Sequence, residues 1–144
     1  MREIKFRGYN RKNKQWLYGF YLQNRGYHFV CPDEWATGKL WDDYQVEPET
    51  VGQFTGLTDK NGKEIYEGDI VKRHCNVYGL DDIGVVKYDD EKARFVLYCK
   101  ERHYAKSLPF MKQQTINDGQ CTIEETFTYE IIGNIHDNPK FKED

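Results

Sequence analysis

The residues with the clearest chemical potential lie near the N-terminus, where cations and aromatic side chains are interleaved. The candidate binding surface consists of Arg7, Arg11, Lys12, Lys14, Trp16 and Tyr18. Arginine and lysine bind phosphate oxygens, and aromatic rings stack on bases, so this set is typical of a hairpin that contacts nucleic acid. The same basic turn can instead dock on an acidic surface, of this chain or of another protein. A third interpretation is a solubilising turn, because Lys and Arg on an edge strand oppose aggregation.

Cysteine and histidine offer a zinc site as a further candidate. The pairs that lie close in sequence are His28 with Cys31, His74 with Cys75, and Cys99 with His103; Cys121 is the remaining cysteine. No Cys-x-x-Cys pair occurs, and the adjacent His74 and Cys75 would point to opposite faces of a strand. We therefore predict reduced, buried thiols and a protein that holds neither a metal nor another cofactor.

No catalytic constellation is visible in the sequence. Ser107 is the only serine and lies outside any Gly-x-Ser-x-Gly turn, and neither a phosphate-binding loop nor a dinucleotide fingerprint occurs. The adjacent acids that could bind a divalent metal are Asp42-Asp43, Asp81-Asp82 and Asp89-Asp90-Glu91. Runs of this kind are typical of solvated turns. We therefore expect a protein that is not an enzyme.

Alternating hydrophobicity in residues 1–30 predicts a three-stranded meander that would position the candidate surface. Ile4 and Phe6 would face inward from the first strand, residues 16–22 form the second strand, and residues 27–31 form the third. The segment that follows, a loop or short helix, contains Trp35 and Trp41. Burial in the core is favoured for these two rings over an exposed binding surface.

Turn signals divide the remaining chain into short strands. Asn61-Gly62 predicts a type I′ hairpin turn, which needs positive φ at both residues. Residues 83–88 and 94–99 are predicted to form the two strands of a second hairpin. Residues 122–135 are predicted to form a late strand, and the long polar segment 101–119 has room for a short helix.

These elements predict a mainly β fold with at most one or two short helices. We expect one domain over residues 1–144, with an N-terminal meander and loop in residues 1–50 and a barrel-like part in residues 51–144. The pattern of residues 65–135 is similar to that of a small SH3-like barrel.

Composition and charge exclude several classes of protein. Aromatic residues are 15% of the 144-residue chain, which excludes a disordered protein, and the net charge of −3 argues against a generally basic nucleic-acid binder. No apolar run approaches the roughly 18 residues of a membrane span, and the N-terminus does not read as a signal peptide, so we expect a cytoplasmic protein. The charge is uneven, at +6 in residues 1–30, −7 in residues 31–69 and −2 in residues 70–144.

Three segments carry a resemblance to a known family. The central block runs Val51-Gly52-Gln53-Phe54-Thr55-Gly56-Leu57 and then Asp59-Lys60-Asn61-Gly62-Lys63-Glu64-Ile65-Tyr66-Glu67-Gly68-Asp69-Ile70-Val71. The ends are Arg2-Glu3-Ile4-Lys5-Phe6-Arg7 and Tyr129-Glu130-Ile131-Ile132-Gly133-Asn134-Ile135. Together they resemble the YopX family of phage and prophage proteins, although Gly8-Tyr9 stands where that family has a small residue followed by Trp. The resemblance implies a small protein of the host-cell cytoplasm and supplies no catalytic residues.

We therefore expect a phage- or prophage-encoded accessory protein that acts as a non-enzymatic protein-interaction module. Its partner would be an unknown phage or host protein, or a second copy of the chain, because a small β-rich protein cannot bury every aromatic ring. The alternative is a nucleic-acid-binding protein that uses the basic aromatic N-terminal hairpin. Salt dependence separates the two, because phosphate contacts weaken steeply as salt rises.

Overall fold

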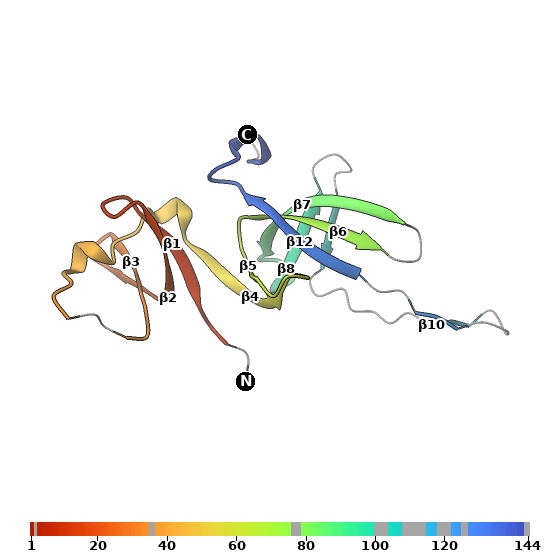
Figure 1. The fold of residues 1–144 in the computed structure, drawn as a ribbon, viewed down its shortest axis with the longest axis horizontal. Coiled ribbons are helices and arrows are strands. Elements are labelled where there is room, and N and C mark those ends of the chain that lie inside the picture. Colours follow the sequence, from red (N-terminus) through yellow and green to blue (C-terminus); the bar gives the residue numbers. More distant parts are fainter. Residues whose placement is uncertain are drawn as a thin grey trace. The chain divides into compact units, whose positions relative to one another are not determined.

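The fold is built almost entirely from antiparallel strands, which confirms the β-rich prediction (Figure 1). The structure is a computed structural model that describes residues 1, 3–34, 37–75, 79–99, 104–107, 115–117, 122–124 and 127–142. Helical geometry in these residues is confined to single 3₁₀ turns at Trp41–Asp43, Pro48–Thr50 and Pro139–Phe141. The chain divides into two compact units, Met1–Gly56 and Leu57–Asp144.

The first unit contains the predicted meander. Strands β1 (Phe6–Asn10), β2 (Gln15–Asn24) and β3 (Tyr27–Cys31) pair in chain order, and β3 has the predicted bounds. Arg25 and Gly26, which have φ values of 49° and 83°, form a two-residue turn between β2 and β3. This turn, with positive φ at both central residues, meets the requirement of type I′. Strand β4 (Gly52–Thr58) pairs with the free side of β1.

A segment after β3 returns across the meander and closes its core. The Val46 N–H donates to the carbonyl oxygen of His28 at 2.8 Å, and the Glu47 N–H donates to that of Tyr9 at 3.0 Å. A Cβ added at Gly8 would lie 2.8 Å from the Val46 side chain, so only glycine leaves room for this packing. Gly8 therefore supplies a residue without a side chain where the return segment crosses β1.

The predicted orientation of the first strand is wrong in part. Strand β1 begins at Phe6, and Ile4 is 67% exposed, whereas Arg7 is buried at 6% exposure. Arg7 tolerates burial because its guanidinium carbon lies 4.9 Å from the ring centroid of Trp16. Phe6 is half-buried as expected, so the predicted alternation fails at Ile4 and Arg7.

The preference for burying the two tryptophans of the loop is also wrong for Trp41. Its ring remains 57% exposed and packs edge-on against Phe29, with 5.5 Å between the ring centroids. One edge of the indole thus covers a buried neighbour while the other meets solvent. Trp35 lies outside the described residues.

The second unit is organised around a five-stranded sheet of order β12-β6-β7-β8-β9. Its strands are β6 (Asp69–Cys75), β7 (Leu80–Asp89), β8 (Arg94–Cys99), β9 (Tyr104–Ser107) and β12 (Phe127–Asn134). The predicted hairpin of residues 83–88 and 94–99 is confirmed by the pairing of β7 with β8. Strands β10 (Thr115–Asn117) and β11 (Thr122–Glu124) form a separate two-stranded sheet. The described parts of residues 101–119 are therefore strands rather than a short helix.

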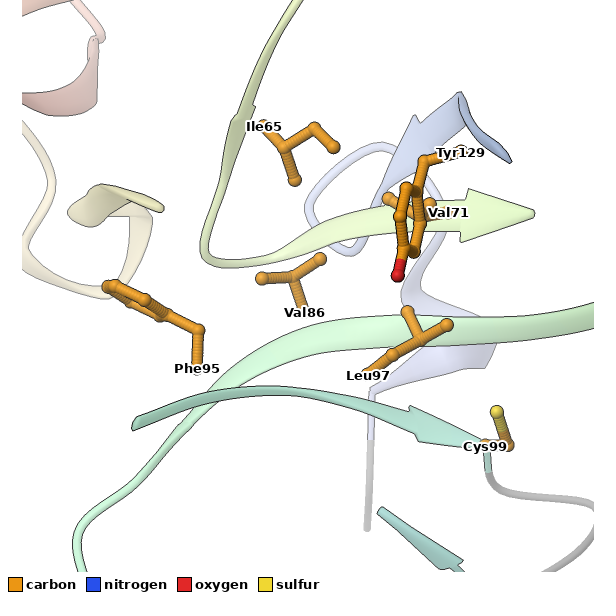
Figure 2. Close-up of a cluster of buried hydrophobic side chains, with 7 residues drawn as sticks. All are labelled: Ile65, Val71, Val86, Phe95, Leu97, Cys99 and Tyr129. Carbon is orange, nitrogen blue, oxygen red and sulfur yellow. The ribbon is translucent and has the colours of Figure 1, made fainter. Parts of the chain in front are cut away.

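Seven buried side chains form the core of this unit (Figure 2): Ile65, Val71, Val86, Phe95, Leu97, Cys99 and Tyr129. They come from the sheet and from the short strand β5 (Glu64–Tyr66), which pairs with β4. The SH3-like barrel expected for residues 65–135 is not confirmed, because each five-stranded sheet ends in two edge strands instead of closing on itself.

The turn between β4 and β5 has a different conformation from the predicted type I′. Gly62 has a φ of 80°, but Asn61 is not left-handed. The Gly62 N–H donates to the Asp59 carbonyl oxygen at 3.0 Å, and the Asp59 N–H donates to that of Lys63 at 2.7 Å, which encloses a three-residue loop. The Asp59 carboxylate selects this loop, because its Oδ1 accepts from the N–H groups of Asn61 at 2.8 Å and Lys63 at 3.0 Å.

Asp59 also ties this turn to the edge of the second sheet. Its Oδ2 accepts from the Ile131 N–H at 3.2 Å, and the Lys60 N–H donates to the Tyr129 carbonyl oxygen at 2.8 Å. Burial alone would raise the pKa of Asp59, but the hydrogen bonds from Lys63, Ile131 and Asn61 outweigh it and lower that pKa. The buried carboxylate therefore stays ionised and covers part of the free edge of β12.

Replacing Gly62 with valine is expected to destabilise the protein by about 1 kcal/mol or more, because a β-branched residue resists positive φ. No atom lies within 4 Å of a Cβ added at Gly62, so the cost comes from the backbone alone. Gly62→Asn is the matched control, since asparagine tolerates the left-handed region. Chemical denaturation measures both variants, and equal midpoints for Val and wild type would contradict the turn.

Candidate functional site

The structure places the cations of the N-terminal turn against acids of the same unit. Arg11 Nε lies 2.5 Å from Glu47 Oε1, and Lys12 Nζ lies 2.9 Å from both Asp42 Oδ2 and Asp43 Oδ1. These carboxylates raise the pKa of Lys12. Hydrogen bonds hold the pKa of Asp43 well below its usual range. The largest contribution comes from the backbone N–H of Leu40, and smaller ones come from the side chains of Lys12 and Asn13. The basic turn thus docks on the acidic segment of its own chain, as one of the interpretations of the sequence allowed.

Asn10 fixes the acidic segment beside the turn. The buried Asn10 Nδ2 lies 3.0 Å from the carbonyl oxygen of Asp42, 3.1 Å from that of Asp43 and 2.8 Å from that of Gln45. Its Oδ1 accepts from the Asn13 N–H at 2.6 Å. A hollow of about 470 Å³ lies here, lined by Asn10, Arg11, Lys12, Asp42, Gln45, Val46, Glu47 and Pro48. The cations and acids of this hollow pair with one another, so their charges balance.

Arg7 and Trp16 pack against each other instead of forming an open binding surface. Arg7 is buried, and its guanidinium group stacks over Trp16. The other side of this stack is set by Tyr9, whose ring meets Trp16 edge-on at 5.6 Å between centroids. Lys14 is exposed and has a φ of 52°, so its backbone shapes the hairpin turn. Of the six predicted site residues, Tyr18 alone combines an aromatic ring with high exposure.

Tyr18 belongs to an exposed apolar surface of which the sequence reasoning assigned only Tyr18 to the candidate site. The exposed fractions are 45% for Tyr18, 49% for Phe20, 37% for Leu22 and 56% for Tyr27. Leu22 lies opposite Phe29, and Asn24 lies opposite Tyr27, so the Tyr27 side chain shares a face with the three β2 side chains. We call these four residues the β2 apolar face. The sequence feature that could have indicated this face is the absence of charged residues from the ten residues of β2.

The described residues offer no cluster of three or more His, Cys, Asp or Glu side chains that could hold a metal. Cys31, Cys75 and Cys99 are buried free thiols, and burial raises the pKa of Cys31. His74 pairs with Asp81 rather than with its neighbour Cys75, because adjacent strand residues face opposite sides. His103 and Cys121 lie outside the described residues.

The fold and this surface define a β-rich protein of two small units with an exposed apolar strand face. A family model described as YopX protein matches residues 5–142. The chain therefore belongs to the YopX family.

One solved structure supports the same fold. The crystal structure of protein EF1440 from Enterococcus faecalis is similar with a TM-score of 0.52 and 22% sequence identity, over 99% of this chain and 100% of that chain. No curated protein matches the sequence. In the described part of the chain, no helix has the length and apolar character needed to cross a membrane.

Proposed function

We propose that this chain is a non-enzymatic protein-interaction module that binds its partner through the β2 apolar face. The observation that carries this proposal is the exposure of Tyr18, Phe20, Leu22 and Tyr27 as one neighbouring set. Large apolar side chains gathered on a surface mark interaction sites, because burying them removes apolar area from water. The absence of charge on β2 favours a partner that is itself apolar at the contact, since no ion pair is available to orient it.

The expected origin and location belong to the same proposal. Family membership supports a phage or prophage accessory protein that acts in the cytoplasm of its host. The partner is then a phage or host protein, and a second copy of this chain is one such partner. Light scattering at micromolar concentration separates self-association from binding to a different protein.

Nucleic-acid binding remains the alternative function, and the geometry favours it less. Contacts to phosphate need accessible cations. In the first unit, Arg11 and Lys12 are paired with carboxylates, and Arg7 is buried. The exposed rings could stack on bases, but Arg7 is buried and Arg11 and Lys12 are held by carboxylates, which leaves Lys14 as the exposed candidate cation.

The test is affinity capture from host cells that carry the phage, with wild type and two matched variants. Phe20→Ser removes the centre of the β2 apolar face, and Ile132→Ser removes a side chain of similar exposure, 48%, from the second unit. We expect Phe20→Ser to lower recovery of the specific partner about tenfold, as loss of an interface anchor does, while Ile132→Ser retains it. Equal recovery with both variants would contradict the proposed surface.

A further inference from the structure

The second unit has a hollow of about 350 Å³ that the proposed interaction surface does not use, lined by Lys60, Lys72, His74, Asp81, Thr128, Tyr129 and Glu130. Strand pairing explains why these side chains meet. Thr128 lies opposite His74, and His74 lies opposite Asp81, so three neighbouring strands contribute one row. Glu130 and Lys72 pair in the next row on the same face. The partly exposed side chains of Lys72 and His74 alternate along β6 with the buried Val71, Arg73 and Cys75, which places the hollow on the solvent-facing side of the sheet.

The carboxylates of this hollow are already engaged. Asp81 Oδ1 lies 2.7 Å from His74 Nδ1, and its Oδ2 lies 2.7 Å from Lys72 Nζ. Glu130 Oε2 lies 2.7 Å from Lys60 Nζ. Because these contacts neutralise and orient both acids, the acids hold the cations in place and are not the groups that await a ligand.

Both lysines of this hollow keep hydrogen-bond donors beyond those used in the ion pairs. A lysine ammonium has three N–H donors, and each of the two ammoniums uses one of them in these pairs with described residues. A carboxylate only accepts, so the proton of the His74–Asp81 contact lies on Nδ1, and Nε2 is left for a ligand. The exposed side chain of Thr128 adds a hydroxyl in the same row. A site rich in donors fits a ligand rich in acceptors.

We propose that this hollow, the Lys72–His74 hollow, binds the phosphate group of a small phosphorylated molecule. Lys60 and Lys72 would supply charge-assisted hydrogen bonds, the Thr128 hydroxyl would add a third contact, and the His74 ring would lie beside the bound group. The volume is near the lower end of small-molecule sites, about 300–1,000 Å³. A long polyanion fits less well, because it would also run past the carboxylates of Asp81 and Glu130. This site belongs to the second unit, so its test is independent of the test of the β2 apolar face.

The test is titration of the full chain with inorganic phosphate at constant pH, followed by NMR of the histidine ring protons. Chloride is adjusted so that ionic strength stays constant. We expect a saturable chemical-shift change at His74. His28 is the internal control, because it lies in the first unit with Nδ1 bound to the Tyr21 hydroxyl at 2.5 Å. Equal responses of His74 and His28 would overturn the proposal.

Two variants decide whether the named donors are responsible. Lys72→Met is expected to weaken phosphate binding about tenfold, the loss of roughly one charge-assisted hydrogen bond. Lys87→Met is the matched control, because Lys87 lies on β7 with its ammonium 4.7 Å from the ring centroid of Tyr98 and outside the hollow. Thr128→Val provides a second reading if Lys72→Met does not fold. Unchanged affinity in Lys72→Met or in Thr128→Val would contradict the assignment. Titration with an oligothymidylate provides a separate comparison, and tighter binding of it than of phosphate would indicate a nucleic-acid site instead.

Discussion

Replacing Asp82 with asparagine is expected to destabilise the protein by about 3–5 kcal/mol, the cost of leaving one member of a buried ion pair uncompensated. Asp82 and Arg73 are cross-strand partners of β7 and β6, and both side chains are buried. Their side chains form an ion pair, and the Arg73 guanidinium carbon also lies 4.8 Å from the ring centroid of Phe127. Asparagine preserves the size of the side chain but removes the charge that balances Arg73.

Asp81→Asn is the matched control for this variant. Asp81 is adjacent in sequence and also contacts Lys72 and His74, but its side chain is 40% exposed. Exposed pairs contribute about 0–1 kcal/mol, because solvent screens them and their side chains lose entropy. Urea denaturation of both variants measures the contrast, and equal free energies of unfolding would contradict the assigned role of the buried pair.

A paired replacement separates loss of charge balance from loss of packing. Changing Arg73 to Met and Asp82 to Leu together removes both charges and keeps apolar volume in the core. We expect this double variant to be more stable than Asp82→Asn alone. A double variant as unstable as the single one would show that packing, rather than the uncompensated guanidinium, accounts for the loss.

The local pattern predicted strands better than it predicted which way their side chains face. Period-two alternation located β2 and gave the bounds of β3, since each strand needs only its own residues to be recognised. The burial of Arg7 depends on Trp16, which the hairpin brings beside it, and the pattern assumes that charged residues face solvent. The alternation of Tyr18, Phe20 and Leu22 likewise indicated one shared face without showing that this face is exposed.

The predicted type of the turn after β4 was wrong for a related reason. Asn61-Gly62 is a strong local signal for type I′, and the turn does fall at these residues. Its conformation, however, is set by the Asp59 carboxylate, which also accepts from Ile131, 72 residues further along the chain. A dipeptide rule carries no information about that partner.

The candidate site shows the same division between local and distant determinants. The cations around Arg11 and Lys12 cluster where the sequence indicated, at the first hairpin turn. Their partners Asp42 and Glu47 lie thirty or more residues further along the chain, so their neutralisation could not be derived from spacing. Phe20, Leu22 and Tyr27 were not assigned to the candidate site, because uncharged strand residues are equally typical of a buried core.

Replacing Gly19 with alanine is expected to cost about 3 kcal/mol or more, at or above the upper end of overpacking penalties. A Cβ at this position would lie 1.8 Å from the carbonyl oxygen of Cys31 and 2.5 Å from its carbonyl carbon. Both are backbone atoms, so no side-chain rotation relieves the overlap. Strands β2 and β3 must separate where Phe20 lies opposite Cys31.

Gly26→Ala is the control for Gly19→Ala, since Gly26 has a positive φ of 83° but no atom within 4 Å of an added Cβ. Its expected cost is about 1 kcal/mol, from backbone conformation alone. Chemical denaturation compares the two, and similar losses would contradict the close approach of β2 and β3. Gly19→Ala should also weaken partner binding, because displacement of β2 moves Phe20. Phe20→Ser should weaken binding while leaving most of the stability intact. The two variants therefore distinguish removal of a contact side chain from displacement of the strand that carries it.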